Sequence, residues 1–149
     1  MDIKIEDASL KHLDKLFEIE EQCFTEEAFT KQQISYLLTD YNTISLIAKS
    51  NNEIAGFIIL QLENEDDSVF GHIITLNVAT KYRRKGIAQT MLHEAERLLK
   101  SRRIAECRLE VRQDNTAAIK LYQHLGYQEI GKLERYYGKK HGLYLKKNL

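Results

Sequence analysis

The sequence predicts one α/β domain with a mixed central sheet, spanning residues 1–149. Two kinds of periodicity indicate this class, because some segments alternate apolar and polar residues as strands do and others repeat apolar residues at helical spacing. The composition agrees, since 43% of the residues are hydrophobic and 30% are charged, as in an ordinary globular domain. A chain of 149 residues can bury one sizeable core, and no linker or repeat divides it.

A strand and a helix open the chain. Residues 3–6 alternate in hydropathy as a strand does. Leu13 and Leu16 begin an apolar stripe at helical spacing that continues to Phe24. Ser9 is a suitable N-cap, so we expect the helix to start shortly after it.

A second helix has its own start signal. Thr30 and Gln33 have the spacing of a capping box, in which each side chain accepts a hydrogen bond from the backbone N–H of the other. Phe29 and Ile34 flank this box at the two positions of a hydrophobic staple. We therefore expect a short helix that begins after Thr30 and ends near Leu38.

Three strands follow the second helix. Segments 43–49 and 54–62 are predicted to form a hairpin across the polar turn 50–53. The acidic stretch 64–67 then interrupts the pattern before a third strand-like segment, 69–78.

The second half of the chain alternates helices and strands. Apolar residues at helical spacing predict a helix over 87–101, and alternation predicts a strand over 106–111. Asn115 is placed to cap a helix over 116–125. The last elements that we expect are strands near 127–133 and 142–146.

The segment between the 69–78 strand and the 87–101 helix is rich in basic residues. It consists of Arg83, Arg84, Lys85, Gly86, Ile87, Ala88 and Gln89. A helix N-terminus has unpaired N–H groups and a partial positive charge, so it can bind a phosphate that is able to approach. Gly86 permits the turn and leaves that approach free of a side chain. The segment predicts an anion cradle, although a solvated charge run is the simpler interpretation of this cluster alone.

Other phosphate-binding motifs are absent from the sequence. The chain has neither Gly-x-x-x-x-Gly-Lys-Ser/Thr nor Gly-x-Gly-x-x-Gly, so the usual nucleoside triphosphate and dinucleotide loops are not predicted. What remains is Arg83-x-x-Gly86-x-Ala88 after a strand, and this motif needs support from elsewhere in the chain.

A second block of residues downstream supplies that support. It comprises Leu109-Glu110-Val111-Arg112, Asn115, Ala118 to Tyr122, and Gly126-Tyr127. With Arg83-x-x-Gly86-x-Ala88, this block resembles the GNAT superfamily of acetyl-CoA-dependent N-acetyltransferases in order and spacing. The Leu-Glu-Val-Arg block and Arg135-Tyr136-Tyr137 are most similar to the branch that acetylates protein N-terminal α-amino groups, including ribosomal-protein alanine acetyltransferases. The resemblance implies the GNAT acyl-CoA N-acyltransferase fold, a mixed sheet of about seven strands with about four helices.

The resemblance also implies how acetyl-CoA would bind. In this family the strands that correspond to 73–78 and 106–111 splay apart, and the pantetheine arm enters the gap. Leu76, Asn77 and Val78 would be cofactor-binding positions, with Leu76 and Val78 acting through their backbone and the Val78 N–H polarising the thioester carbonyl. Residues 83–89 would hold the pyrophosphate. Asn115 would lie against CoA, a role compatible with capping a helix.

Two residues are implied as the catalytic groups. The acceptor amine must lose a proton before it attacks, and charge develops on the thioester oxygen. Glu110 would act as the base, directly or through water, and no covalent enzyme intermediate is required. Tyr122, near the cofactor sulfur, would protonate or hydrogen-bond the departing thiolate. Without the resemblance, Glu110 is simply a strand residue paired with Arg108 or Arg112, and Tyr122 is a core tyrosine.

The acceptor side is less defined by the sequence. Some relatives place a catalytic or substrate-binding glutamate near Glu26, which makes it an alternative base, a substrate contact or a solvated charge. Tyr136 and Tyr137 resemble tyrosines that grip a substrate peptide, and the alternative is a stacked hairpin edge. The leading hypothesis is transfer of acetyl to protein N-termini in a ternary complex. A lysine or small-amine acetyltransferase, or a non-catalytic CoA-binding module, remains as an alternative.

Composition limits the other partners. The 22 basic and 22 acidic residues cancel, so neither nucleic acid nor an anionic membrane is expected as a partner, and the sequence makes no prediction about a ribosome or partner subunit. No apolar run approaches the roughly 20 residues of a membrane helix, and the charged start is unlike a signal peptide, so we expect a cytoplasmic location. Cys23 and Cys107 are expected as buried free thiols. The five histidines show no metal-ligand spacing, and we predict no metal.

Overall fold

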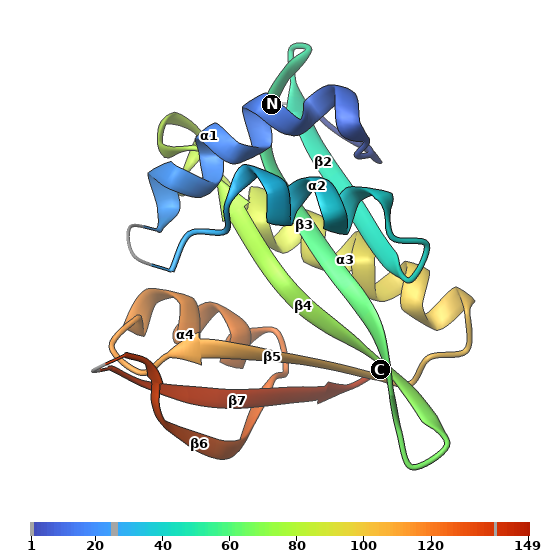
Figure 1. Ribbon diagram of the computed structural model, residues 1–149, viewed down its shortest axis with the longest axis vertical. Coiled ribbons are helices and arrows are strands. Elements are labelled where there is room, and N and C mark those ends of the chain that lie inside the picture. The colour runs from blue at the N-terminus through green and yellow to red at the C-terminus, as the bar shows by residue number, and fades with distance from the viewer. Residues whose placement is uncertain (1, 25–26, 139) are drawn as a thin grey trace.

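The computed structural model describes residues 2–24, 27–138 and 140–149. Within them, one seven-stranded mixed sheet has the order β1-β2-β3-β4-β5-β7-β6 (Figure 1). The strands are β1 (Ile3–Asp7), β2 (Thr43–Ser50), β3 (Glu53–Glu65), β4 (Ser68–Val78), β5 (Glu106–Arg112), β6 (Gln128–Tyr137) and β7 (Lys140–Asn148). The helices are α1 (Leu13–Cys23), α2 (Lys31–Thr39), α3 (Ile87–Ser101) and α4 (Thr116–His124), with 3-10 turns η1 (Leu10–His12) and η2 (Thr80–Tyr82). The predicted α/β class and order of elements are confirmed.

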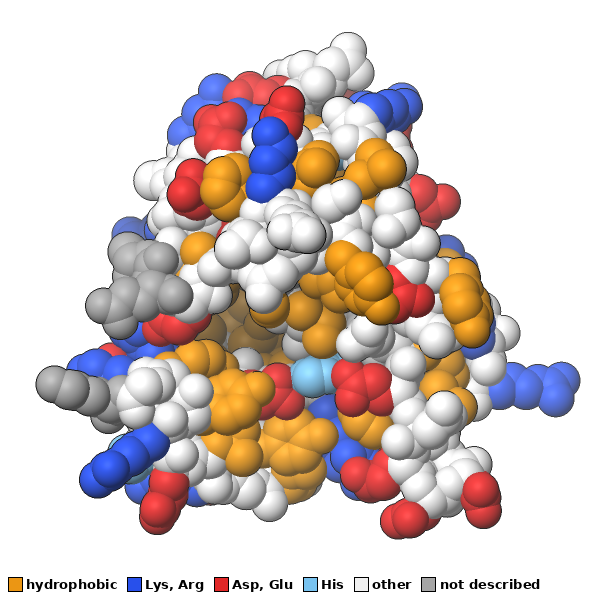
Figure 2. Space-filling view, in the orientation of Figure 1, with side chains coloured by type: hydrophobic (Ala, Val, Ile, Leu, Met, Phe, Trp, Pro, Cys, Tyr) orange, Lys and Arg blue, Asp and Glu red, His pale blue; other side chains and the backbone are white. Residues whose placement is uncertain are grey.

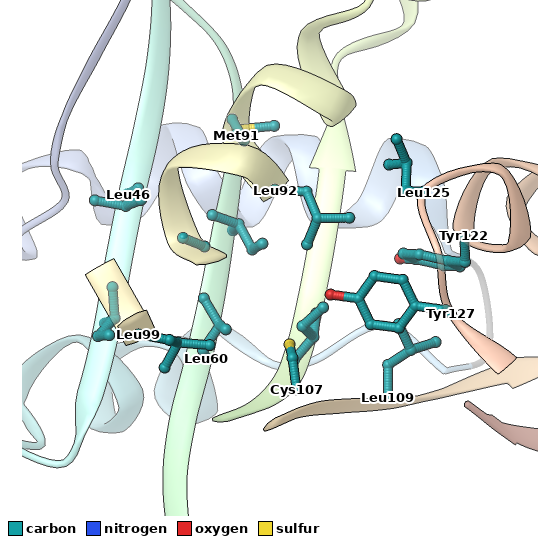
Figure 3. Close-up of a cluster of buried hydrophobic side chains, with 14 of the residues drawn as sticks. Leu46, Leu60, Met91, Leu92, Leu99, Cys107, Leu109, Tyr122, Leu125 and Tyr127 are labelled. Atoms are coloured by element: carbon teal, nitrogen blue, oxygen red, sulfur yellow. The ribbon is translucent and has the colours of Figure 1, made fainter. Parts of the chain in front are cut away.

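Helices cover both faces of the sheet and produce two apolar clusters. On one face, residues of α3 and α4 pack against the sheet, and Figure 3 shows part of this cluster, including Leu92, Tyr122 and Tyr127. On the other face, α1 and α2 pack through Leu16 and Ile34 against β2 and β3. Among the described residues, no helix is both long enough and apolar enough to cross a membrane.

Local start signals account for the two N-terminal helices to different degrees. At α2 the predicted capping box is present, since Gln33 N–H donates to Thr30 Oγ1 at 3.1 Å and Thr30 N–H donates to Gln33 Oε1 at 2.8 Å. Ser9 is an N-cap, as predicted, but it caps the 3-10 turn η1 that runs directly into α1. Ser9 precedes the 3-10 turn η1, and α1 begins only at Leu13 with His12 as its N-cap.

The sheet opens between β4 and β5. These parallel strands pair only at Gly71↔Cys107, His72↔Arg108 and Ile73↔Leu109, and beyond this point they diverge (Figure 1). The splay expected from the family resemblance is therefore confirmed. Its cause lies in β4, where the register with β3 shifts so that Ile74 is an extra residue between Ile73 and Thr75. Such a bulge bends a strand and increases its twist, so β4 turns away from β5.

Candidate active site

A cavity of about 540 Å³ occupies the gap where β4 and β5 separate. Its walls come from α1, the residues that follow α1, the diverging strands, the start of α4 and the end of β6. The cavity brings together several residues singled out from the sequence, namely Leu76, Glu110, Asn115, Tyr122, Tyr136 and Tyr137. Figure 2 shows the hollow, with a histidine between acidic side chains at its floor.

His72 lines the cavity between two carboxylates, and no sequence motif connects it with the site. Its Nε2 lies 2.7 Å from Glu110 Oε1, and its Nδ1 contacts the carboxylate of Glu63. The three residues come from β3, β4 and β5, and His72 stands one register pair from the end of the parallel ladder. No local motif joins them, so only the strand register could have revealed the cluster.

The cluster favours a protonated His72. Burial of the ring lowers the pKa of His72, but the hydrogen bonds and charges of Glu110 and Glu63 together raise it above its ordinary value. Both ring nitrogens face carboxylate oxygens, and only the imidazolium has two N–H donors. The imidazolium then donates one hydrogen bond to each of the two carboxylates.

The raised pKa of His72 predicts a pH-dependent contribution to stability. This contribution is fully present below the unfolded value of about 6.5 and is lost as the pH rises through the higher folded value. The wild type should therefore exceed His72→Gln in unfolding free energy by more at pH 6 than at pH 9. The extra amount is about 1.4 kcal/mol for each pKa unit by which the folded state raises His72 above its unfolded value. Urea denaturation across this range measures it. His93→Gln, at an exposed position, is the control and should show no such pH dependence. If the stability difference between the wild type and His72→Gln grew with pH, a raised pKa of His72 would be contradicted.

Tyr122 lies on α4 with its side chain largely buried in the wall of the cavity. Its ring packs edge-on against Tyr127 at a centroid distance of 5.7 Å. Its hydroxyl donates to no other described residue, and burial raises the pKa of Tyr122, so the hydroxyl keeps its proton. Asn115 caps the same helix, since its side chain accepts a hydrogen bond from Ala118 N–H at 3.2 Å.

The segment predicted to be an anion cradle has a backbone that leaves N–H groups open at the start of α3. Gly86 is the N-cap of α3 in the left-handed region, with φ 77°, and Arg84 before it has φ 63°. Thr90 is the first helix residue to donate back, to Gly86 O at 3.0 Å, so the N–H groups of residues 87–89 have no intrahelical partner. A Cβ at Gly86 would meet no atom within 4 Å, which leaves the approach open.

Arg83 behaves differently from the rest of the cradle. Its guanidinium turns back toward β4, where Nε donates to Val78 O at 3.3 Å and an Nη lies 3.3 Å from Cys23 Sγ. Its side chain therefore braces the end of β4 and the end of α1. The side chains of Arg84 and Lys85 are exposed, and these are the charges that the cradle presents to solvent.

Arg84→Ala should raise the dissociation constant for CoA by about tenfold or more, because an exposed guanidinium beside the helix N-terminus is placed to make a charge-assisted hydrogen bond to phosphate. Isothermal titration calorimetry with CoA measures this change. Arg97→Ala removes the same charge from the exposed middle of α3 and should leave the affinity within about twofold. Equal losses of CoA affinity in both variants would show that Arg84 acts only through the overall charge of the protein.

The free edge of β4 is formed by backbone groups of Leu76 and Val78. Ala79 N–H donates across to Ala55 O in β3 at 2.7 Å, and successive residues of a strand point their polar groups to opposite sides. The backbone groups of Leu76 and the N–H of Val78 therefore face the gap, whereas the carbonyl of Val78 already accepts a hydrogen bond from Arg83. The Asn77 side chain is only 2% exposed and turns toward α1, so Asn77 offers the gap no side-chain contact.

One side of the cavity is lined by aromatic and charged groups. Tyr136 and Tyr137 pack edge-on with centroids 4.8 Å apart, and burial raises the pKa of Tyr137. Across from them, Arg112 of β5 pairs with Glu27 at 2.5 Å, which joins the segment after α1 to the far wall. The predicted substrate residue Glu26 lies outside the described residues.

The thiols and the metal prediction can be compared with the described part of the chain. Cys107 is buried as expected, and burial raises its pKa to about 12. Cys23 is only half-buried and lines the cavity, so the expectation of a buried thiol is wrong there. The described residues include no group of three or more histidine, cysteine, aspartate or glutamate side chains arranged to hold a metal ion.

The split sheet with its cavity, and the open helix start that follows β4 in the chain, define an α/β domain that can hold an extended anionic ligand beside a carboxylate–histidine cluster. The chain belongs to the acetyltransferase (GNAT) family, which matches residues 13–127. It is 32% identical over 117 residues to an N-alpha-acetyltransferase of Saccharolobus solfataricus, covering 72% of this chain and 70% of that protein.

Solved structures share the fold. The ribosomal-protein-S18-alanine N-acetyltransferase of Escherichia coli superposes with a TM-score of 0.87 at 22% identity, covering 99% of this chain and 94% of the other. Arabidopsis thaliana NAA60, solved in complex with acetyl-CoA, superposes with a TM-score of 0.88 at 17% identity, covering 99% and 100%. The family and its N-alpha-acetyltransferase branch are those predicted from the sequence.

Proposed function

We propose that this protein transfers the acetyl group of acetyl-CoA to the α-amino group of protein N-termini, by direct attack in a ternary complex. The observation that carries the proposal is the Glu110–His72–Glu63 cluster at the floor of a cavity that is also lined by Tyr122, whose hydroxyl has no hydrogen-bond partner among the described residues. The name of the Saccharolobus relative supports the choice of acceptor.

The cavity and the cradle fit acetyl-CoA. Residues 84–89 would hold its pyrophosphate, and the backbone of Leu76 would pair with the amides of its pantetheine arm. Bound there, acetyl-CoA supplies the activated acetyl group. The Val78 N–H faces the gap, where a backbone donor stabilises negative charge on a carbonyl oxygen.

Proton transfer is assigned to Glu110 and its neighbours. An α-amino group has a pKa near 8, so at neutral pH a modest base suffices to produce the free amine. Glu110 takes this proton, directly or through a water molecule, while the 2.7 Å hydrogen bond from His72 holds its carboxylate. Tyr122 donates its hydroxyl proton toward the departing thiolate.

The charges of the cavity favour a cationic acceptor. Its lining contains Glu20, Glu27, Glu110 and Asp114 against the cations Arg112 and His72. This acidic surplus attracts an ammonium group, whereas the basic cradle at the start of α3 attracts phosphate. Tyr136, Tyr137 and Glu26 remain our predicted contacts for the acceptor peptide, and a cytoplasmic location remains a prediction from the sequence.

The proposal is tested by incubating the protein with acetyl-CoA and three sets of acceptors: peptides with free N-termini, N-terminally blocked peptides with internal lysines, and small amines. Mass spectrometry with fragmentation locates the acetyl group. We expect label on α-amino groups. Label confined to lysine or to small amines would reject the proposed acceptor, and CoA binding without any transfer would favour a non-catalytic module.

A further inference from the structure

A buried carboxylate on α1 takes part in none of the proton transfers described above. Glu20 is 0% exposed, and its side chain borders the cavity. One oxygen, Oε1, accepts hydrogen bonds from Thr75 Oγ1 and from Asn77 Nδ2, both at 2.8 Å. The other oxygen, Oε2, accepts the backbone N–H of Phe29 at 3.1 Å.

Glu20 is held without a cationic partner among the described residues, since all three of its donors are neutral. Burying a carboxylate in this way costs free energy that an apolar residue at the same position would not cost. Burial raises the pKa of Glu20, and the three hydrogen bonds oppose that rise. The reason for a carboxylate here therefore lies in the groups that it binds.

Those groups belong to two separate parts of the chain, strand β4 and the segment between α1 and α2. Thr75 and Asn77 flank Leu76, whose backbone faces the gap, and they point toward α1 only because the bulge at Ile74 changes the alternation of β4. Phe29 belongs to the acceptor loop, which we define as residues 27–30, between α1 and α2. One side chain thus connects the free edge of β4 with the acceptor loop.

The orientation of Asn77 shows which contact dominates. Its Nδ2 donates to both Glu20 and Thr75, while its buried Oδ1 has no partner among the described residues. An unpaired buried oxygen is costly, so the amide is oriented by the need of Glu20 for donors. The network is built around the carboxylate.

We propose that Glu20 is a positioning residue for the acyl acceptor, holding the acceptor loop at a set distance from the free edge of β4. This inference rests on the proposed function, because the acceptor must enter beside that loop. Removing the carboxylate would let the loop move, while β4 stays paired with β3 and the cradle at the start of α3 is unchanged, so both elements that would bind CoA stay in place. Removing Glu20 should therefore weaken binding of the acceptor and leave the affinity for CoA unchanged.

The test compares Glu20→Gln with the wild type in two measurements. Glutamine places an NH2 donor among three donors, so at least one hydrogen bond is lost. We expect KM for the acceptor peptide to rise by about tenfold, the factor for one lost hydrogen bond to a charged group, and the dissociation constant for CoA to stay within about twofold. Amide hydrogen exchange of residues 27–30 should accelerate by a similar factor, with that of α3 unchanged.

Glu96→Gln is the matched control. Glu96 is also a buried glutamate, but it lies on α3 and binds Tyr127 and Lys147 away from the cavity, so its loss should lower stability without changing acceptor KM. If Glu20→Gln does not fold, Thr75→Val removes one donor and should give a smaller change of the same kind. Unchanged exchange in the acceptor loop, or an equal rise in the CoA dissociation constant, would overturn the inference. The exchange measurement needs no turnover, so failure of the proposed function would be distinguishable from failure of this inference.

Discussion

Replacing Glu110 with glutamine is expected to lower kcat by about 100-fold or more while the dissociation constant for CoA stays within about twofold, because general-base catalysis contributes factors of this size. Glutamine keeps the shape of the side chain and one acceptor oxygen for His72, whose Nε2 now lies 2.7 Å from the Glu110 carboxylate. What it loses is the ability to take the proton of the acceptor. Steady-state kinetics with an N-terminal peptide, together with CoA titration, separates these effects.

Glu106→Gln on the same strand is the control for this prediction. Glu106 pairs with Arg108 and Lys146 and does not line the cavity, so its replacement should leave kcat within about twofold. An unchanged rate in Glu110→Gln would move the role of base to Glu26 or to water. A loss of CoA affinity as large as the loss of kcat would instead indicate that the variant has disturbed the gap.

Tyr122→Phe is expected to reduce kcat by about 100-fold with little change in stability or CoA affinity. The substitution removes only the hydroxyl, which has no partner among the described residues, and keeps the ring that packs edge-on against Tyr127. No internal hydrogen bond is broken, so the whole effect should appear in the chemical step. Single-turnover measurements of acetyl transfer test this directly, since they exclude product release.

Tyr127→Phe is the complementary variant at the neighbouring ring. Its hydroxyl donates to Glu96 at 2.8 Å in the core, so removing it leaves a buried carboxylate with one donor fewer and should cost about 1–3 kcal/mol of stability. Its rate of acetyl transfer at a temperature where it is folded should match the wild type. Equal rates for Tyr122→Phe and the wild type would remove Tyr122 from the mechanism and leave it as a packing residue.

Local signals predicted the elements well because their causes are local. The capping box at Thr30 and the N-cap at Asn115 need only residues three positions away, and both are present. Ser9 also marks a helical start, but the first turn after it is a 3-10 turn, because a cap signal does not specify which kind of turn follows it. The motif from Arg83 to Ala88 located the open helix start, since a left-handed glycine before a helix is itself a local property.

Local signals of this kind could not predict the cluster of Glu63, His72 and Glu110 at the floor of the cavity. His72 and Glu110 are 38 residues apart, and they meet because His72 stands opposite Arg108 in a parallel ladder whose register no short motif specifies. The same holds for Glu20, which is separated from its donors Thr75 and Asn77 by more than fifty residues.

The sequence alone determined the class of the domain, the order of its elements and the residues that form the cradle and the candidate catalytic pair. Only the tertiary structure decided which distant residues these residues contact. One extra residue in β4, Ile74, ends its pairing with β5, opens the cavity and turns Thr75 and Asn77 toward α1. Side-chain periodicity in a strand is two, so a single inserted residue exchanges the faces of everything beyond it. Whether that insertion occurs depends on pairing with a distant strand, and this is why it could not be predicted from the residues near it.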